Sequence, residues 1–217
     1  MLMTDPATTD PTASLISPLV ATQIGQPGEP IRLGILASGS GSNFEAVAEA
    51  IAAGKLNARI QVLIYNNPEA KVAVRAAKWD VPAILLNHRD FPNREDLDRQ
   101  IVQTLQQNAV EWVIMAGWMR IVTPILIDAF PNQIINIHPS LLPSFRGTRA
   151  VEQALAAGVK ITGCTVHLVV PEVDSGPILL QAAVPILPDD TEETLHARIQ
   201  VQEHRILPLA IALATGQ

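Results

Sequence analysis

The sequence predicts a single α/β domain with a mostly parallel twisted sheet, helices on both faces and an antiparallel β pair toward the C-terminus. From residue 31 onward, short apolar runs alternate with amphipathic stretches, which is typical of parallel strands joined by helices. After residue 148 the pattern changes, and two β-rich segments flank the turn sequence PEVDSGP. A chain of 217 residues can bury a sizeable core, and no repeat or linker interrupts residues 31–217.

The elements of the first two thirds follow from the apolar and amphipathic stretches in chain order. Short apolar runs predict strands at residues 31–37, 58–65, 83–86, 112–116 and 133–138. The amphipathic stretches between them predict helices at residues 43–53, 69–79 and 93–108, and a shorter helix that starts at Pro124. This alternation is the basis of the predicted parallel sheet.

The last third contains two β segments between two helices. A helix is expected near residues 149–157, followed by β segments at 160–170 and 178–186. The turn composition between these segments predicts a hairpin-like antiparallel pair. Thr191, preceded by two Asp and followed by Thr194, provides capping groups for the start of the last helix.

The first 30 residues differ in composition from the rest. They are rich in Pro and Thr and contain no Lys or Arg, whereas secretory and transit peptides need a basic region. We therefore expect a disordered N-terminal extension over residues 1–30 and a folded domain over residues 31–217. No apolar run is long enough to span a bilayer, so a cytoplasmic location without membrane association is the default expectation.

Charge and cysteine content narrow the possible partners. The chain has 15 Lys and Arg against 21 Asp and Glu, a net charge of −6 that offers no basic field for a nucleic-acid backbone. We therefore expect small-molecule partners and no nucleic acid, with a monomer and a homodimer both open. Cys164 is the only cysteine, so no intramolecular disulfide forms, and it is expected to pack as a small residue in a strand.

A Gly/Ser turn in ILASGSGSNFEAV connects the first predicted strand to the first helix. Backbone N–H groups at such a helix start, together with the helix dipole, form an anion site, to which Ser42 and Asn43 add polar groups. Phe44 replaces the third glycine of a dinucleotide fingerprint, and no Gly-Lys-Ser/Thr for a triphosphate follows. The turn therefore predicts a site for one phosphate.

Asn136 and His138 lie two residues apart at the end of the strand predicted in IINIHPSLLP. Their side chains should therefore share one face, at the strand end where open parallel sheets bind ligands. An amide donor beside an imidazole suits a reaction in which a carbonyl becomes tetrahedral and its oxyanion needs donors. Asp174, in the turn PEVDSGP, is the best candidate for a carboxylate that keeps the imidazole protonated. The alternative is a core histidine and an exposed turn carboxylate.

Four motifs in this chain resemble those of the phosphoribosylglycinamide formyltransferase family, the folate-dependent GAR transformylases of purine synthesis. The motifs SGSGSNF, NIHPSLLP, DSGPI and VQEHRILPL occur in the order and spacing of that family, across residues 31–213. The resemblance implies a formyltransferase-type, Rossmann-like fold. It also implies transfer of a formyl group from the co-substrate 10-formyltetrahydrofolate to the amine of glycinamide ribonucleotide (GAR).

The same resemblance implies roles for individual residues. It makes Asn136, His138 and Asp174 the catalytic trio. The residues implied in binding the phosphate and ribose of GAR are Gly41, Ser42, Asn43, Gln200 and Glu203. The residues implied in binding 10-formyltetrahydrofolate are Arg94, Met119, Arg120, Ile121, Val122, Asn136, Val170 and Asp174. One position departs from the family pattern, because Arg149 stands where members often carry a His, and the RG before it resembles methionyl-tRNA formyltransferases.

Two other functions remain open from the sequence. One is a different formyl-folate enzyme, such as a deformylase or a methionyl-tRNA formyltransferase, although the acidic charge balance disfavours tRNA. The other is a non-catalytic nucleotide- or folate-binding protein. No metal is expected, because the five histidines show no ligand spacing; His88, His167, His196 and His204 are therefore expected to be structural.

Overall fold

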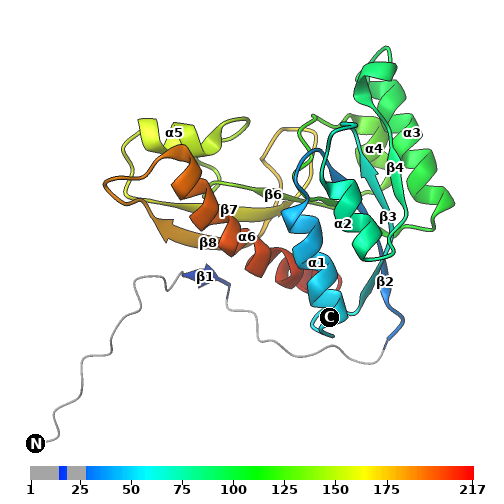
Figure 1. Cartoon of the computed structure of the whole chain (residues 1–217), viewed down its shortest axis with the longest axis horizontal. Helices are drawn as coiled ribbons and strands as arrows, with labels where there is room; N and C mark the ends of the chain where they lie inside the picture. The colour runs from blue at the N-terminus through cyan, green and yellow to red at the C-terminus, as the bar shows by residue number, and fades with distance from the viewer. Residues whose placement is uncertain (1–14, 19–27) are drawn as a thin grey trace, which may run out of the picture.

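A single eight-stranded sheet forms the centre of the molecule. The computed structural model describes residues 15–18 and 28–217, and its strands lie in the order β1-β8-β7-β6-β5-β2-β3-β4 (Figure 1). The strands are β1 (Ile16–Ser17), β2 (Ile31–Ala37), β3 (Ala58–Tyr65), β4 (Ala83–Leu85), β5 (Trp112–Met115), β6 (Ile134–His138), β7 (Ile161–Leu168) and β8 (Ile178–Pro185). The predicted fold class is confirmed.

The parallel half of the sheet contains β2 to β6. β2 lies between β3 and β5, so the chain runs outward to β4 and then returns to build β5 and β6 on the other side. The strand order thus reverses between β2 and β5. In open α/β sheets, ligands bind in the crevice outside the carboxyl ends of the strands at such a reversal.

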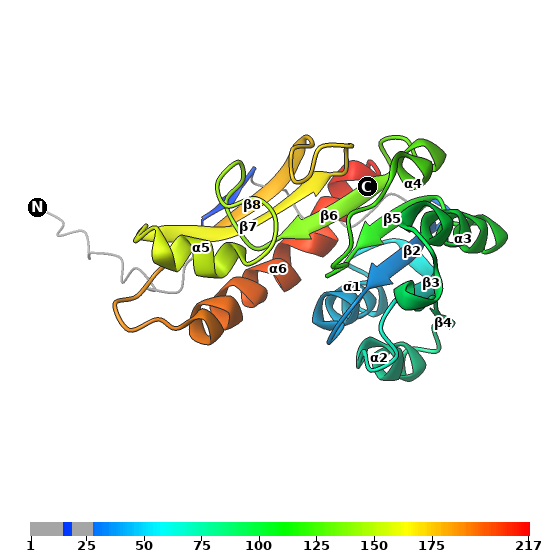
Figure 2. The same ribbon diagram turned by 90° about the horizontal axis from the view of Figure 1, so that it is seen from above.

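Helices cover both faces of this sheet. Their bounds are α1 (Ser42–Ala52), α2 (Val72–Lys78), α3 (Arg94–Gln107), α4 (Pro124–Ala129), α5 (Ala150–Ala156) and α6 (Glu192–Ala214), with a short 3₁₀ turn at His88–Asp90. One core cluster joins α1, α2 and α6 to one face, and a second joins α3 and α4 to the other (Figure 2). None of the helices described here is both long and apolar enough to cross a membrane.

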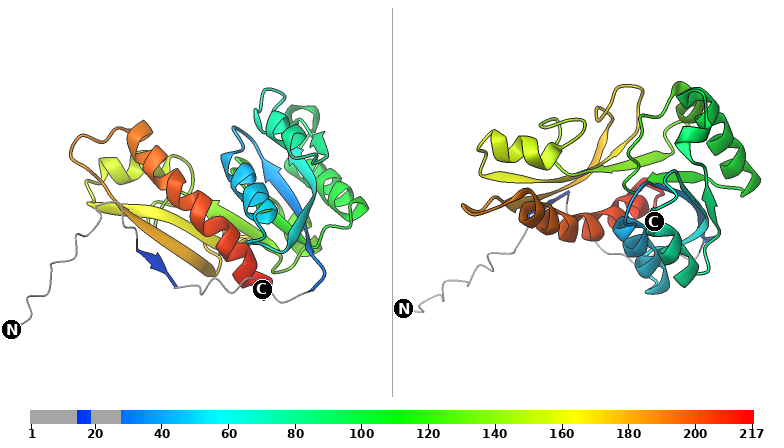
Figure 3. Two further views of the ribbon diagram at one scale, coloured as in Figure 1. Left: turned by 60° about the horizontal axis from the view of Figure 1, so that its bottom comes forward. Right: turned by 45° about the horizontal axis from the view of Figure 1, so that its top comes forward.

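The C-terminal β segments form the predicted antiparallel pair. β7 pairs antiparallel with β8, and on its other side it also pairs antiparallel with β6, which joins the pair to the parallel sheet. The long helix α6 packs across these strands (Figure 3). Cys164 is buried in β7 as expected, and burial raises the pKa of its thiol.

Strand β1 was not predicted from the sequence. Most of the N-terminal extension expected to be disordered, residues 1–14 and 19–27, lies outside the described residues. Within residues 15–18, however, Ile16 and Ser17 pair antiparallel with Ala182 and Gln181 at the outer edge of β8. Ile16 also packs against the core cluster beneath the sheet. Part of the extension therefore has a defined place.

A double substitution, Ile16→Cys with Ala182→Cys, is expected to form a disulfide under mild oxidant. The N–H of Ala183 donates to the oxygen of Leu15 at 2.9 Å, so Ile16 and Ala182 are a non-hydrogen-bonded pair. The Cα atoms of such pairs are about 4.5 Å apart, within the range that disulfides span. Non-reducing mass spectrometry measures the cross-link. Ser17→Cys with Ala182→Cys is the control, because those side chains point to opposite faces; equal cross-linking of both pairs would contradict the register.

Candidate active site

One pocket lies at the carboxyl ends of β2, β5 and β6, where the strand order reverses. Its volume is about 490 Å³, within the usual range for small-molecule sites. The loops after these three strands line it, and the turn between β7 and β8 and one side of α6 complete its wall. The pocket therefore occupies the position that the fold class predicts for a ligand.

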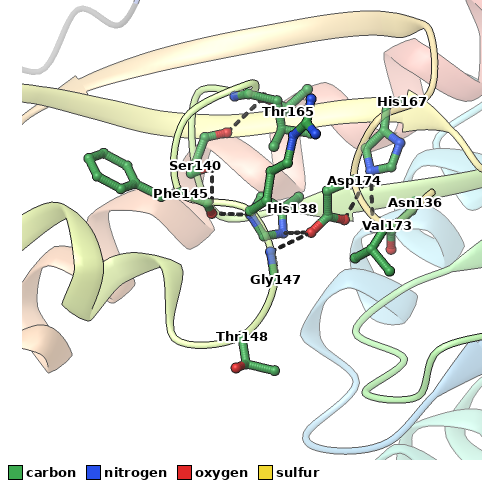
Figure 4. A network of polar contacts seen from close by, with 12 residues as sticks. Asn136, His138, Ser140, Phe145, Gly147, Thr148, Thr165, His167, Val173 and Asp174 are labelled. Carbon is green, nitrogen blue, oxygen red and sulfur yellow. Dashed lines mark hydrogen bonds and ion pairs between the residues drawn. The ribbon is translucent and has the colours of Figure 1, made fainter.

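Asn136, His138 and Asp174 come together in this pocket (Figure 4). The ring nitrogen Nδ1 of His138 lies 3.4 Å from Oδ2 of Asp174, and both side chains are less than a tenth exposed. Asp174 has a φ of 51°, in the left-handed region, at a turn whose backbone aims its carboxylate inward. The turn carboxylate and the strand histidine thus meet as the sequence predicted.

A loop between β6 and α5 fixes the other side of the His138 ring. Nε2 of His138 lies 2.8 Å from the oxygen of Phe145, and because a carbonyl only accepts, Nε2 must carry the proton. The hydroxyl of Ser140 donates to the oxygen of Ser144 at 2.6 Å, and that of Thr165 donates to the oxygen of Ser140 at 2.7 Å. Nδ1 of His138 therefore faces a carboxylate and Nε2 donates to a carbonyl, so both ring nitrogens have an acceptor beside them.

His167 is a member of this cluster that the sequence analysis missed. Its Nε2 lies 3.2 Å from Nδ2 of Asn136 and 3.6 Å from Oδ1 of Asp174, while Nδ1 donates to the oxygen of Leu168 at 2.8 Å. In the β6–β7 register His167 is directly opposite Asn136. The only sequence signal was the spacing of Thr165 and His167 on one face of β7, which becomes informative once the antiparallel pairing with β6 is known.

The surroundings of Asp174 favour its ionised form. Burial alone would raise the pKa of this carboxyl, but His167, the N–H of Gly147 at 2.8 Å and the charge of His138 outweigh burial and hold the pKa below its usual value of 3.8. Because the folded-state pKa is lowered, the carboxylate contributes stability above the usual value, and that contribution is lost as the pH falls through the folded-state pKa. At neutral pH Asp174 is therefore a fixed negative charge beside two imidazoles.

The Gly/Ser turn lies opposite this cluster, at the start of α1. Gly41 precedes the helix with a φ of 78°, and a Cβ atom there would lie 2.4 Å from the side chain of Val72, so only glycine fits. Nδ2 of Asn43 donates to Oε2 of Glu203 on α6 at 2.9 Å. Burial raises the pKa of Glu203, and the bond from Asn43 only partly offsets this.

A comparison with known families accounts for this arrangement. The family model described as formyl transferase matches residues 31–211, which include every element except β1 and the last residues of α6. The chain belongs to the formyl transferase family. The predicted resemblance to phosphoribosylglycinamide formyltransferases is confirmed by the relatives that follow.

Relatives of this formyl transferase include enzymes of similar length and much longer proteins. The chain is 39% identical over 185 residues to phosphoribosylglycinamide formyltransferase of Bacillus subtilis, covering 85% of this chain and 95% of that protein. It is 40% identical to the human trifunctional purine biosynthetic protein adenosine-3 over 85% of this chain, but it spans only 18% of that protein. It also spans only 14% of the corresponding trifunctional protein of Drosophila pseudoobscura pseudoobscura.

Solved structures of similar proteins share the fold. Glycinamide ribonucleotide transformylase 1 from Symbiobacterium toebii superimposes with a TM-score of 0.85 at 46% identity, covering 87% of this chain and 90% of that one. Phosphoribosylglycinamide formyltransferase from Bacillus halodurans gives a TM-score of 0.81 at 43% identity, over 85% of this chain and 94% of that one. The fold of this formyl transferase therefore agrees with that of relatives of known structure.

In this formyl transferase the pocket collects all but one of the residues predicted for the site. Besides the trio, its lining includes Gly41, Ser42, Asn43, Met119, Arg120, Ile121, Val122, Val170, Gln200 and Glu203. The exception is Arg94, which is the first residue of α3, is exposed and does not line the pocket. Arg149, the departure from the family pattern, lines the rim, with a φ of 61° and an ion pair to Glu152 at 2.6 Å.

The remaining histidines of this formyl transferase are spread over the fold. His196 lies on α6 at the pocket wall, His204 is half-buried on the same helix, and His88 contacts the oxygen of Asn66 through Nδ1 at 2.9 Å. Among the described residues, no group of three or more His, Cys, Asp or Glu side chains is arranged to hold a metal ion. The histidine cluster at the site thus consists of His138 and His167.

Proposed function

We propose that this chain transfers the formyl group of 10-formyltetrahydrofolate to the amine of GAR, releasing formyl-GAR and tetrahydrofolate in the cytoplasm as a step of de novo purine biosynthesis. The observation that carries the proposal is the convergence of Asn136, His138 and Asp174 opposite a phosphate-type turn in one pocket. Membership in the formyl transferase family and the named relatives support the same activity. Residues 31–217 form the catalytic unit in this proposal.

The catalytic roles follow from the donors around the reacting carbon. The GAR amine attacks the formyl carbon, and the carbonyl oxygen gains negative charge. Nδ2 of Asn136 donates to this oxygen, a contribution worth about 10²- to 10³-fold in rate for such a donor. The ring of His138, whose two nitrogens face Asp174 and the oxygen of Phe145, stabilises the same oxygen through the positive charge of its protonated form. Asp174 stabilises the charged imidazole. As the bond between the formyl carbon and the folate nitrogen breaks, a water held by Asp174 carries the amine proton to that nitrogen.

The binding roles divide the pocket between the two substrates. The backbone N–H groups of Gly41, Ser42 and Asn43 take the phosphate at the start of α1, where the helix dipole favours an anion. Gln200 and Glu203, which line the pocket from α6, accept from the ribose.

The folate co-substrate occupies the other half of the pocket. Met119 and Ile121, which are 71% and 54% exposed, offer apolar surface to its ring system, together with Arg120, Val122 and Val170. Exposed apolar side chains gathered at a pocket are a common sign of a ligand surface. We also propose that Arg94 contacts the part of the folate co-substrate that extends beyond the pocket.

An assay of the purified chain with 10-formyl-5,8-dideazafolate, with and without GAR, tests the proposal. Release of the deformylated folate is expected only when GAR is present, and formyl-GAR should appear in equal amount by mass spectrometry. Release without GAR would instead identify a deformylase. Folate binding without any turnover, measured by calorimetry, would identify a binding protein.

Substitution of His167 by Leu is expected to lower kcat about tenfold. The acceptor for Asn136 is lost, and a hydrogen bond worth about 1 to 1.5 kcal/mol corresponds to roughly this factor. His167→Gln keeps a polar partner and should retain more activity. Steady-state kinetics with both variants measure the difference. Equal losses in both, with a matching fall in thermal stability, would mean that His167 only supports the fold.

A further inference from the structure

The proposed phosphate turn is held from outside by helix α2. Nε of Arg75 donates to the oxygen of Ser40 at 2.9 Å, and the N–H of Val72 donates to the oxygen of Gly39 at 3.2 Å. Two successive carbonyls of the turn are therefore fixed by donors one helical turn apart on α2. With these oxygens directed at α2, the N–H groups that follow them are available to the pocket.

The packing at Gly41 fixes the distance between the turn and α2. The Cα of Val72 lies 2.9 Å from the position of a Cβ at Gly41, and the side chain of Val72 is closer still. The turn therefore lies in close contact with α2, and a change in the side chains of α2 is transmitted directly to the backbone of the turn.

Arg75 also neutralises a carboxylate beside the anion site. Glu45 lies in the first turn of α1, where its side chain is 15% exposed, and it forms ion pairs with Arg75 and with Lys78, the latter at 2.8 Å. A carboxylate in this turn satisfies the helix dipole but would compete with a bound phosphate for the same positive end. The guanidinium of Arg75 contacts both the Glu45 carboxylate and the turn, whereas the ammonium of Lys78 contacts only the Glu45 carboxylate.

We infer that Arg75 is a positioning residue for the nucleotide phosphate. It holds the Ser40 carbonyl away from the anion and cancels the charge of Glu45, so that the N–H groups at the start of α1 meet the phosphate in a fixed geometry. The inference rests on the proposed function, because it concerns the phosphate of GAR. An ordinary surface ion pair would add little to stability and would not alter the binding of one substrate selectively.

The experiment compares Arg75→Met with two partner variants in the full chain. Arg75→Met is expected to raise KM for GAR about tenfold while changing kcat and KM for the folate less than about twofold. Lys78→Met removes one positive charge from Glu45 without touching the turn, and it should raise KM for GAR less than about threefold. The double variant Arg75→Met with Glu45→Gln should recover part of the affinity for GAR, because it no longer has an uncompensated carboxylate beside the anion site. The recovery should be partial, because the turn still lacks its contact with Arg75.

Three results would overturn the inference. An unchanged KM for GAR in Arg75→Met would show that the turn holds its geometry alone. Equal increases of KM for GAR in Arg75→Met and Lys78→Met would show that Arg75 acts only through its charge. A parallel change in both KM values and kcat would indicate general destabilisation.

A measurement without turnover separates this inference from the proposed function. Inorganic phosphate should raise the thermal unfolding midpoint of the unaltered chain more than that of Arg75→Met, because a ligand stabilises the state that binds it. If the unaltered chain has no GAR-dependent activity but shows this difference, the proposed function fails and the role of Arg75 stands. If phosphate protects both proteins equally, the role of Arg75 fails whatever the activity.

Discussion

Replacement of Asp174 by asparagine is expected to lower kcat about 10²- to 10³-fold and to change KM for GAR less than about threefold. Asparagine keeps the size of the side chain but removes the charge that lies 3.4 Å from Nδ1 of His138. A positive charge on the His138 ring then lacks its stabilising carboxylate, and the developing oxyanion loses the support of that charge. Because this interaction strengthens only as the reaction proceeds, its loss appears in turnover. Steady-state kinetics with both substrates varied make the measurement.

Glu172→Gln is the matched control for this substitution. Glu172 lies in the same turn, but its side chain is 75% exposed and forms an ion pair with Arg146 at 3.1 Å. Its loss should change kcat less than about twofold. A raised KM for GAR with unchanged kcat in Asp174→Asn would assign Asp174 to binding.

Replacement of His138 by alanine is expected to lower kcat at least about 10³-fold while the fold persists. The substitution removes the ring that stabilises the oxyanion, which is also the group that Asp174 stabilises, and residues that act as a unit lose most of their effect together. The structural cost is the loss of the contact with the oxygen of Phe145 and of the ion pair with Asp174, together with a small cavity. We expect the unfolding midpoint to fall less than about 10 °C. Kinetics and thermal unfolding followed by circular dichroism measure the two effects.

His88→Ala provides the comparison for His138→Ala. His88 also contacts a backbone carbonyl, that of Asn66, but it does not line the pocket. The His88→Ala variant should therefore lose some thermal stability and little activity. If His138→Ala abolishes the cooperative unfolding transition, the role of His138 is that of a core residue, and the catalytic assignment is wrong.

The parallel half of the fold and its main site residues were predictable from local pattern. Every strand from β2 to β6 begins or ends within one residue of its predicted bounds, because each follows a short, mostly apolar run in the sequence. The same logic put Asn136 and His138 on one face, since that follows from the two-residue period of a strand. The prediction that Asp174 belongs to the site required only the assumption that the turn between two predicted strands faces the pocket.

The features that were missed depend on register between distant segments. His167 joins the site only because β7 runs antiparallel to β6 in one particular alignment, which no local pattern specifies. β1 is a two-residue strand in a Pro- and Thr-rich stretch, too short to give a periodic signal. The role of Arg75 follows from packing of α2 on the turn, again between segments separated in sequence.

Both edge strands of the eight-stranded sheet are short. At one end β4 has three residues and follows Pro82; at the other, β1 has two residues and precedes Pro18. Short strands beside proline offer few unpaired donors to another chain, whereas the eight-residue, uncharged β8 would be a long template if it were bare. By pairing with Gln181 and Ala182 in the middle of β8, β1 divides this edge into shorter pieces, which leaves a second chain less continuous backbone with which to extend the sheet.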